Sequence, residues 1–214
     1  GHGSGHAVRS IQVIRGLQEA TPNIQVHVRT TAPQWLFASL PREIAYTSRS
    51  MDVGVIQPDS LRMDLAATLA ACDELQRRMP QLLDEEIKFV QAQKIDLIIG
   101  DIPPACFEVE AGAKIPALAI TNFTWDVIYR AYIDRYPQFT QIIEAMRQSD
   151  SKATLALTLP YPCDMNMFPR HEPIPWITRR SCLIQLEART AFGLPQSPTI
   201  VLLSFGGIGL DTLP

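Results

Sequence analysis

The first six residues are the part of the sequence whose types and spacing best suit chemistry. The run Gly-His-Gly-Ser-Gly-His (1–6) leads directly into a helical pattern that begins at Ala7. Glycine lets the backbone approach a bound group closely, and the free N–H groups at a helix N-terminus favour anionic or polar ligands. We therefore predict a ligand-binding loop at residues 1–6. Runs of Gly, Ser and His also occur in expression tags, but the amphipathic helix that follows at once favours a native segment.

A dinucleotide is the first ligand to consider for such a loop. The spacing Gly1-x-Gly3-x-x-His6 places a histidine where the Rossmann fingerprint has its third glycine. The strand expected to end near Thr30 offers no acidic side chain for a ribose hydroxyl. The sequence therefore gives a nicotinamide or flavin dehydrogenase weak support, and we expect no cofactor.

The cysteines and histidines lack the spacing of a metal site. The four cysteines stand singly, without a Cys-x-x-Cys pair, at Cys72, Cys106, Cys163 and Cys182. Isolated cysteines are typical of reduced, buried thiols rather than of a disulfide framework. The four histidines likewise form no pair on one helix face. We therefore predict no bound metal.

Composition excludes several classes of partner. With 46% hydrophobic and 19% charged residues, the 214-residue chain has the composition of a globular protein with a sizeable core. A net charge of −3 without a run of Lys or Arg argues against nucleic acid. No apolar run approaches the roughly 18 residues of a membrane span, and no signal-peptide pattern opens the sequence. We expect a cytoplasmic protein.

The remaining sequence alternates helical and strand patterns. Helical spacing of apolar residues covers 7–20, 61–90, 104–113, 127–136, 139–149 and 181–192, with a short helical piece at 35–37. Strand patterns cover 24–28, 43–47, 96–100, 117–121, 154–159 and 199–204. This alternation predicts an α/β fold with a doubly wound, Rossmann-like parallel sheet. A glycine loop in such folds follows a buried strand, so we expect the first strand to be missing here.

Prolines mark the expected interruptions of this pattern. Pro80 is expected to kink or divide the long helix. The proline-rich stretch 160–176 is expected to lack regular structure and to connect domains. We therefore predict three parts: a Rossmann-like domain at 1–160, a connection with a linking helix at 161–198, and the start of a truncated second domain at 199–214.

Ligands of parallel sheets gather at the carboxyl ends of the strands. The loops that leave the predicted strands are 1–6, 30–34, 101–104, 122–126 and 161–164. We expect all of them to face one crevice.

Five stretches, taken together and in order, resemble GT-B glycosyltransferases. They are Gly-His-Gly-Ser-Gly-His-Ala-Val-Arg-Ser (1–10), Val-His-Val-Arg-Thr-Thr-Ala-Pro-Gln-Trp-Leu-Phe (26–37), Asp-Leu-Ile-Ile-Gly-Asp-Ile-Pro-Pro (96–104), Asn-Phe-Thr-Trp-Asp (122–126) and Ser-Phe-Gly-Gly (204–207). More closely, the chain resembles the glycosyltransferase-like domain in front of the sugar kinase in L-arabinokinase-type proteins, and stand-alone bacterial relatives of that domain. The resemblance spans essentially the whole chain.

The resemblance implies two doubly wound domains facing a cleft, the first binding a hydroxyl acceptor and the second a nucleotide-sugar substrate. A histidine after the first strand is then the general base, and an aspartate at the end of a later strand orients it. His6 and Asp101 match these positions. The residues implied at the acceptor are Gly3, Gly5, Asn122 and Trp125, and those implied at the donor phosphates are Ser204, Gly206 and Gly207. Without the rest of the second domain, we expect the chain alone to be inactive.

Physical chemistry gives the implied pair a reason. A sugar hydroxyl is a poor nucleophile until its proton is removed, and imidazole titrates close to neutral pH. A carboxylate on the other ring nitrogen fixes the tautomer and stabilises the imidazolium. His6 would be the base and Asp101 its partner.

Plainer interpretations remain open. His6 can bond backbone at a helix start, Asp101 can cap the helix that begins near Pro104, and Trp125 can be a core residue. Two other functions also fit: a non-catalytic sugar-sensing or regulatory domain attached to a sugar kinase, and a nucleotide-sugar epimerase.

Overall fold

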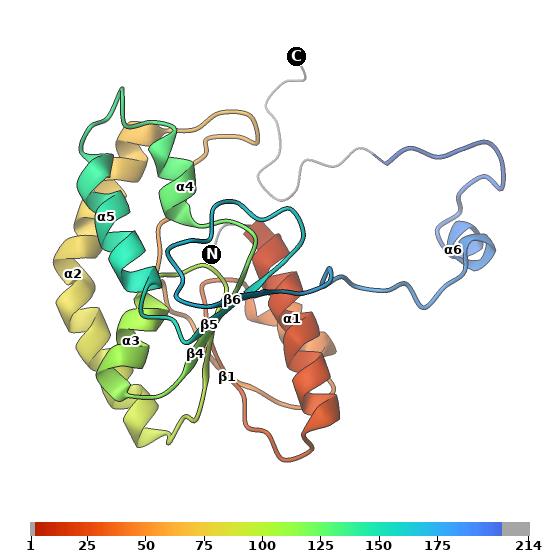
Figure 1. Cartoon of the computed structure of the whole chain (residues 1–214). Coiled ribbons are helices and arrows are strands. Elements are labelled where there is room, and N and C mark those ends of the chain that lie inside the picture. The colour runs from red at the N-terminus through yellow and green to blue at the C-terminus, as the bar shows by residue number, and fades with distance from the viewer. Residues whose placement is uncertain (1–2, 203–214) are drawn as a thin grey trace.

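The computed structural model describes residues 3–202 as a set of parallel strands flanked by helices (Figure 1). The first half contains α1 (Gly3–Ala20), β1 (His27–Arg29), the 3-10 helix η1 (Gln34–Ser39), β2 (Ala45–Thr47), α2 (Leu65–Ala92) and β3 (Ile98–Gly100). The second half contains α3 (Ala105–Ala113), β4 (Ala117–Thr121), α4 (Trp125–Arg130), α5 (Phe139–Asp150), β5 (Leu155–Thr158), β6 (His171–Pro173) and α6 (Gln185–Ala191).

The strands form two parallel sheets. One contains β1 and β2, and the other has the order β3-β4-β5-β6. Every strand pair is parallel, as the alternation of strands and helices predicted. In Figure 1, α1 lies on one side of the strands and α2, α3 and α5 lie on the other. The α/β prediction is confirmed, and the arrangement is consistent with a Rossmann-like fold.

Helix α1 begins earlier than the sequence indicated. Residues 3–6 form its first turn rather than a loop, so the predicted glycine loop is wrong for these residues. A Cβ added at Gly5 would have no atom within 4 Å, so no neighbour requires a glycine there. Helical geometry tolerates glycine at the cost of some conformational entropy.

The long helix α2 is not divided at Pro80. It starts after Asp64, whose carboxylate accepts a hydrogen bond of 2.8 Å from the backbone N–H of Ala67 and so caps the first turn. Leu61 belongs instead to a turn in which Asp59 accepts its backbone N–H at 2.9 Å. This turn explains why the helix begins four residues after the apolar pattern does.

The proline-rich stretch contains a strand, contrary to prediction. Strand β6 adds to β5, with hydrogen bonds from Ala156 N to the Arg170 carbonyl (2.9 Å) and from Ile174 N to the Thr158 carbonyl (2.8 Å). Pro173 is tolerated because β6 is an edge strand. The strand predicted at 199–204 does not form in its described part, where Val201 and Leu202 are 82% and 86% exposed.

The C-terminal helix α6 has no buried residue and lies away from the other elements (Figure 1). The cysteines divide evenly between the two environments: Cys72 and Cys106 are buried, whereas Cys163 and Cys182 are exposed free thiols. The expectation of buried thiols therefore holds for half of them.

Candidate functional site

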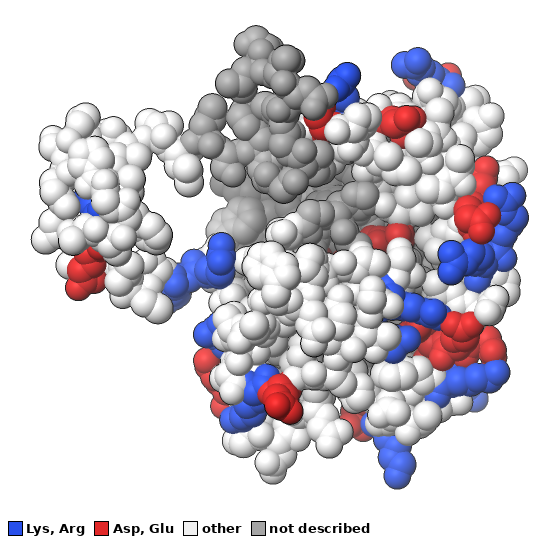
Figure 2. All heavy atoms as spheres, turned by 180° about the vertical axis from the view of Figure 1, so that it is seen from behind, with Lys and Arg blue, Asp and Glu red and all other residues white. Residues whose placement is uncertain are grey.

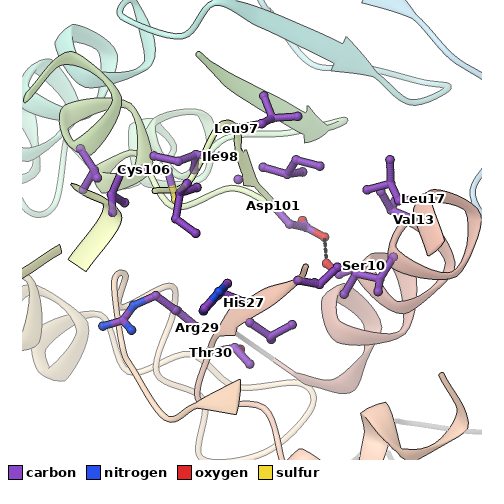
Figure 3. A pocket seen from close by; sticks show the side chains of 18 of the residues that line it. Ser10, Val13, Leu17, His27, Arg29, Thr30, Leu97, Ile98, Asp101 and Cys106 are labelled. Carbon is purple, nitrogen blue, oxygen red and sulfur yellow. Dashed lines mark hydrogen bonds between the residues drawn. The ribbon is translucent and has the colours of Figure 1, made fainter. Parts of the chain in front are cut away.

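Helix α1 and the end of β3 meet in a cluster of polar side chains. His6 Nδ1 lies 2.8 Å from Asp101 Oδ1. Arg9, one turn further along α1, donates its Nε–H to Asp101 Oδ2 at 3.0 Å and a second N–H to Oδ1. Ser10 donates its hydroxyl to Oδ2 at 3.3 Å, the contact dashed in Figure 3. Asp101, at the carboxyl end of β3, is thus in hydrogen-bond contact with His6, Arg9 and Ser10.

The cluster is mostly shielded from water. The side chains of His6, Arg9 and Asp101 are 21%, 15% and 14% exposed. Burial by itself raises the pKa of Asp101, but hydrogen bonds and charge from His6 and Arg9 outweigh it, so the pKa lies below its ordinary value. Asp101 is therefore a carboxylate at neutral pH.

The contacts of His6 Nδ1 require two different tautomers. Arg9 Nη2 lies 3.0 Å from Nδ1, and a guanidinium can only donate, so this hydrogen bond needs an unprotonated Nδ1. The carboxylate of Asp101 can only accept, so the 2.8 Å contact needs a proton on Nδ1. With the proton on Nδ1, Nε2 is free to take a proton from a ligand. When Nδ1 is unprotonated and accepts from Arg9, a neutral His6 carries its proton on Nε2, and this nitrogen can then only donate a hydrogen bond.

The backbone beside Asp101 adopts a conformation that β-branched residues rarely take. Ile102 has φ +83°, in the region that favours glycine, and is only 4% exposed. Its side chain belongs to the core cluster that contains Cys72 and Tyr129. Strain of this kind persists only where packing holds it in place, and it concentrates at functional sites.

The loops after neighbouring strands approach the same cluster. The ring of Phe123, which follows β4, meets His6 edge-on with centroids 5.9 Å apart. The carbonyl of Asn122 accepts a hydrogen bond of 2.8 Å from the backbone N–H of Cys163, which follows β5. The backbone of the half-buried Asn122 therefore links the loop after β4 to the loop after β5.

Three of the predicted acceptor residues, Gly3, Gly5 and Trp125, have surroundings that also suit a structural role. Trp125 is 6% exposed and donates its indole N–H to Asp52 at 3.0 Å. Its ring stacks on Tyr129 at 6.3 Å. Gly3 and Gly5 belong to the first turn of α1. Contact of these residues with an acceptor stays a prediction. Ser204, Gly206 and Gly207 lie outside the described residues.

Sequence reasoning missed several residues at this edge of the sheet. Arg9 and Ser10 follow His6 by three and four residues, a spacing that places them on the same helix face and could have suggested them. Tyr161 and Trp176 form an exposed aromatic pair with centroids 6.1 Å apart and exposed fractions of 85% and 56%. Nothing in the sequence connects these two residues.

Two further kinds of site, a metal centre and a membrane span, were searched for in the described part of the chain. Residues 3–202 contain no group of three or more His, Cys, Asp or Glu that could hold a metal ion. Within the same range, no helix combines the length and apolar character needed to cross a membrane. On the face drawn in Figure 2, acidic and basic side chains lie next to one another rather than in separate patches.

The chain is similar in sequence to part of a known plant protein. No family model matches the chain. The chain is 31% identical over 212 residues to the L-arabinokinase of Arabidopsis thaliana, an alignment that covers 97% of this chain and 20% of that protein. The chain is therefore a distant homologue of one part of that protein and spans about a fifth of its length.

Proposed function

We propose that this chain is a sugar-binding domain of the GT-B glycosyltransferase type, in which His6 removes a proton from the hydroxyl of a sugar acceptor. The observation that carries the proposal is the His6–Asp101 contact of 2.8 Å at the carboxyl end of β3. In parallel α/β sheets this edge is where ligands bind. Homology to part of L-arabinokinase supports a sugar as the ligand.

The proposed step follows from the tautomer in which Nδ1 carries the proton. The acceptor hydroxyl donates its proton to His6 Nε2 as its oxygen attacks the anomeric carbon of a nucleotide-sugar. The bond from that carbon to the nucleotide breaks, and the nucleoside diphosphate leaves with the electron pair. Asp101, an anion under these conditions, stabilises the imidazolium through Nδ1–H. The donor would be held by the second domain implied by the resemblance.

The strained backbone at Ile102 and the burial of Asp101 both suit a carboxylate that orients a general base. A buried carboxylate held by three side chains cannot rotate away from His6, and the constrained backbone at Ile102 fixes where the carboxylate stands. A base that is already oriented loses less entropy when substrate binds.

Sugar binding is tested on the chain itself. We expect L-arabinose or a related monosaccharide to shift the amide resonances of Asp101 and Asn122 in a saturable NMR titration, with roughly millimolar affinity. His6→Ala should abolish the shifts, whereas His171→Ala, at an exposed histidine on β6, should preserve them. No saturable shift with any monosaccharide would contradict sugar binding.

Catalysis is tested in a longer protein that joins this domain to a donor-binding partner. His6→Ala should lower kcat by a factor of about 10² to 10⁴ with a smaller change in KM, as expected for loss of a general base. The same substitution at His171 serves as the matched control. Unchanged turnover would remove His6 from the mechanism.

A sugar-sensing domain attached to a kinase is the second candidate, favoured by the contacts of Arg9. Arg9 donates two hydrogen bonds to Asp101, and its positive charge offsets much of the carboxylate's negative charge. The carboxylate therefore stabilises an imidazolium at His6 less strongly. The contact of Arg9 with Nδ1 belongs to the tautomer that cannot act as a base. Sugar binding without glycoside formation, when donor and acceptor are both supplied, would favour this candidate.

A further inference from the structure

The loops that follow β5 and β6 each carry a large aromatic side chain that is open to solvent. Tyr161 is 85% exposed and Trp176 is 56% exposed, and their ring centroids lie 6.1 Å apart. Between residues 100 and 182, all of which the structure describes, no other large hydrophobic side chain is exposed. This part of the chain therefore shields its large apolar side chains from water except for this one aromatic pair.

The register of the sheet brings the two rings together. Strands β5 and β6 are parallel neighbours in which Thr158 lies opposite Pro173. Tyr161 and Trp176 each stand three residues beyond these partners, past the carboxyl ends of their strands. Ligands of parallel α/β sheets bind at this end of the strands, where Asp101 follows β3. The aromatic pair and the polar cluster therefore share one end of the sheet.

The loop that carries Tyr161 is held on both sides of that residue. Leu159 donates its backbone N–H to the carbonyl of Thr121 at 3.0 Å, and Cys163 donates its backbone N–H to the carbonyl of Asn122 at 2.8 Å. Both acceptors belong to the end of β4 or to the loop that follows it. A side chain on a loop held in this way loses less conformational freedom when it binds a ligand.

The backbone at Tyr161 lies in the left-handed region. Its φ is +57°, a conformation that favours glycine and that few other residues adopt. Packing does not explain an aromatic residue there, because the side chain is mostly in water. Backbone conformations of this kind concentrate at sites that bind ligands. The conformation therefore supports a role for the Tyr161 ring outside the core.

The same loop contacts connect the aromatic pair to the polar cluster. Asn122, which holds the loop of Tyr161, is followed by Phe123, whose ring meets His6 edge-on with centroids 5.9 Å apart. His6 in turn contacts Asp101. A single loop after β4 therefore touches both His6 and the segment that presents Tyr161.

The chemistry of the two side chains suits a sugar ring. A pyranose presents C–H groups on one face, and these pack against the electron-rich face of an aromatic ring. The rings of Tyr161 and Trp176 are inclined by 45°, so they do not cover each other face to face, and their exposure leaves ring surface open to a ligand. The Tyr161 hydroxyl and the Trp176 indole N–H can hydrogen-bond sugar hydroxyls at the rim.

A protein partner fits this surface less well. A stable protein interface covers about 800 Å² on each partner, with several apolar side chains at its centre. Besides the two rings, the exposed residues of 161–176 are prolines, polar side chains and one cysteine. Two isolated rings with polar surroundings match the size and mixed polarity of a single sugar better than those of a protein surface.

We propose that Tyr161 and Trp176 form an aromatic platform that packs on the C–H face of a pyranose ring of the acceptor. This inference rests on the proposed function for its class of ligand, and it adds the residues that recognise the ring itself. The platform selects cyclic sugars over open-chain polyols that carry the same hydroxyl groups, because only a ring presents a rigid C–H face.

The test is an NMR titration of the whole chain, read at the indole N–H of Trp176. L-Arabinose, D-galactose and methyl β-D-glucopyranoside are the cyclic probes, and sorbitol is the open-chain control. The signal that disappears in Trp176→Ala assigns the resonance among those of the three tryptophans. We expect at least one cyclic probe to shift this signal saturably, with roughly millimolar affinity, and sorbitol to leave it unchanged.

Substitutions in the pair measure its contribution to binding. Trp176→Ala and Tyr161→Ala should each weaken binding of the same probe by about threefold to tenfold, read from the amide shifts of Asp101 and Asn122. Tyr161→Phe keeps the ring and should retain most of the affinity. Trp35→Ala, at a tryptophan of η1 that is 72% exposed, is the matched control and should leave the affinity unchanged. All three positions are exposed, so the variants should fold normally.

The outcomes separate the platform from the proposed function. A Trp176 signal that no sugar moves, together with saturable shifts at Asp101 and the same affinity in Trp176→Ala, would overturn the platform and leave the proposed function in place. Shifts at Trp176 without shifts at Asp101 would support the platform and contradict the acceptor site at His6. A Trp176 signal that changes with protein concentration, and not with sugar, would assign the pair to contact between copies and overturn the proposal.

Discussion

Replacing Asp150 with asparagine should stabilise the protein increasingly as pH rises. Asp150 ends α5, is 1% exposed, and neither of its side-chain oxygens has a hydrogen-bond partner among the described residues. Burial, with a further contribution from the charge of Asp126 and an opposing one from Arg147, raises the pKa of Asp150 from 3.8 to about 8. The folded protein therefore keeps this proton at pH values where the unfolded chain has lost it.

The magnitude follows from linkage. Between pH 3.8 and about 8 the unfolded state has released the proton and the folded state has not, so this group lowers stability as pH rises. The slope is about 1.4 kcal/mol per pH unit. Asparagine does not titrate, so the stability advantage of the variant should grow by roughly 3 kcal/mol between pH 5 and pH 7.

Urea denaturation at pH 5, 6, 7 and 8, at constant ionic strength, measures this difference. Other titrating groups contribute equally to both proteins and cancel. Asp73→Asn, at an exposed carboxylate of α2, is the matched control and should show no comparable trend. A difference between Asp150→Asn and the unchanged protein that stays constant across this range would refute the reasoning.

Three further substitutions test the packing and charge described above. Asp101→Asn should cost about 3–5 kcal/mol at neutral pH because it leaves a buried guanidinium unpaired. This cost should shrink only as pH falls below 3.8, the ordinary carboxyl value, toward the lowered pKa of Asp101, as acid titration of stability would show. Glu86→Gln should cost about 3–5 kcal/mol in urea denaturation because two arginines lose their buried partner, whereas Glu74→Gln, in an exposed pair, should change stability by less than about 0.5 kcal/mol. Gly112→Ala should lower stability by about 1–3 kcal/mol, since its Cβ would clash with the side chain of Ile87 of α2. Gly16→Ala meets no atom within 4 Å and should raise the melting temperature.

Local patterns predicted most of the elements. Strand β4 has the bounds expected from its apolar run, and the parallel arrangement followed from the order of helices and strands. Strand β6 was missed because it is stabilised by pairing with β5, a contact that a proline-rich local pattern does not reveal. The first turn of α1 was missed because its glycine, serine and histidine residues are typical of a loop, whereas in the structure they form a helical turn.

The candidate site was predictable only in part. The resemblance to glycosyltransferases placed His6 and Asp101 together, and the structure brings them within hydrogen-bond distance. The hydrogen bonds of Arg9 join residues 92 positions apart, and the positive φ of Ile102 contradicts the usual preference of a β-branched residue. Both depend on tertiary packing, so neither could be derived from local sequence.

The tautomer of His6 tests the central claim most directly. Nitrogen-15 NMR of the chain labelled at histidine distinguishes protonated from unprotonated ring nitrogens, and the absence of one signal set in His6→Gln assigns the resonances. For the neutral imidazole we predict a proton on Nδ1, hydrogen-bonded to Asp101, and an unprotonated Nε2 available to a sugar hydroxyl. A proton on Nε2, with Nδ1 accepting from Arg9, would contradict a general base and leave His6 as a donor to a bound ligand.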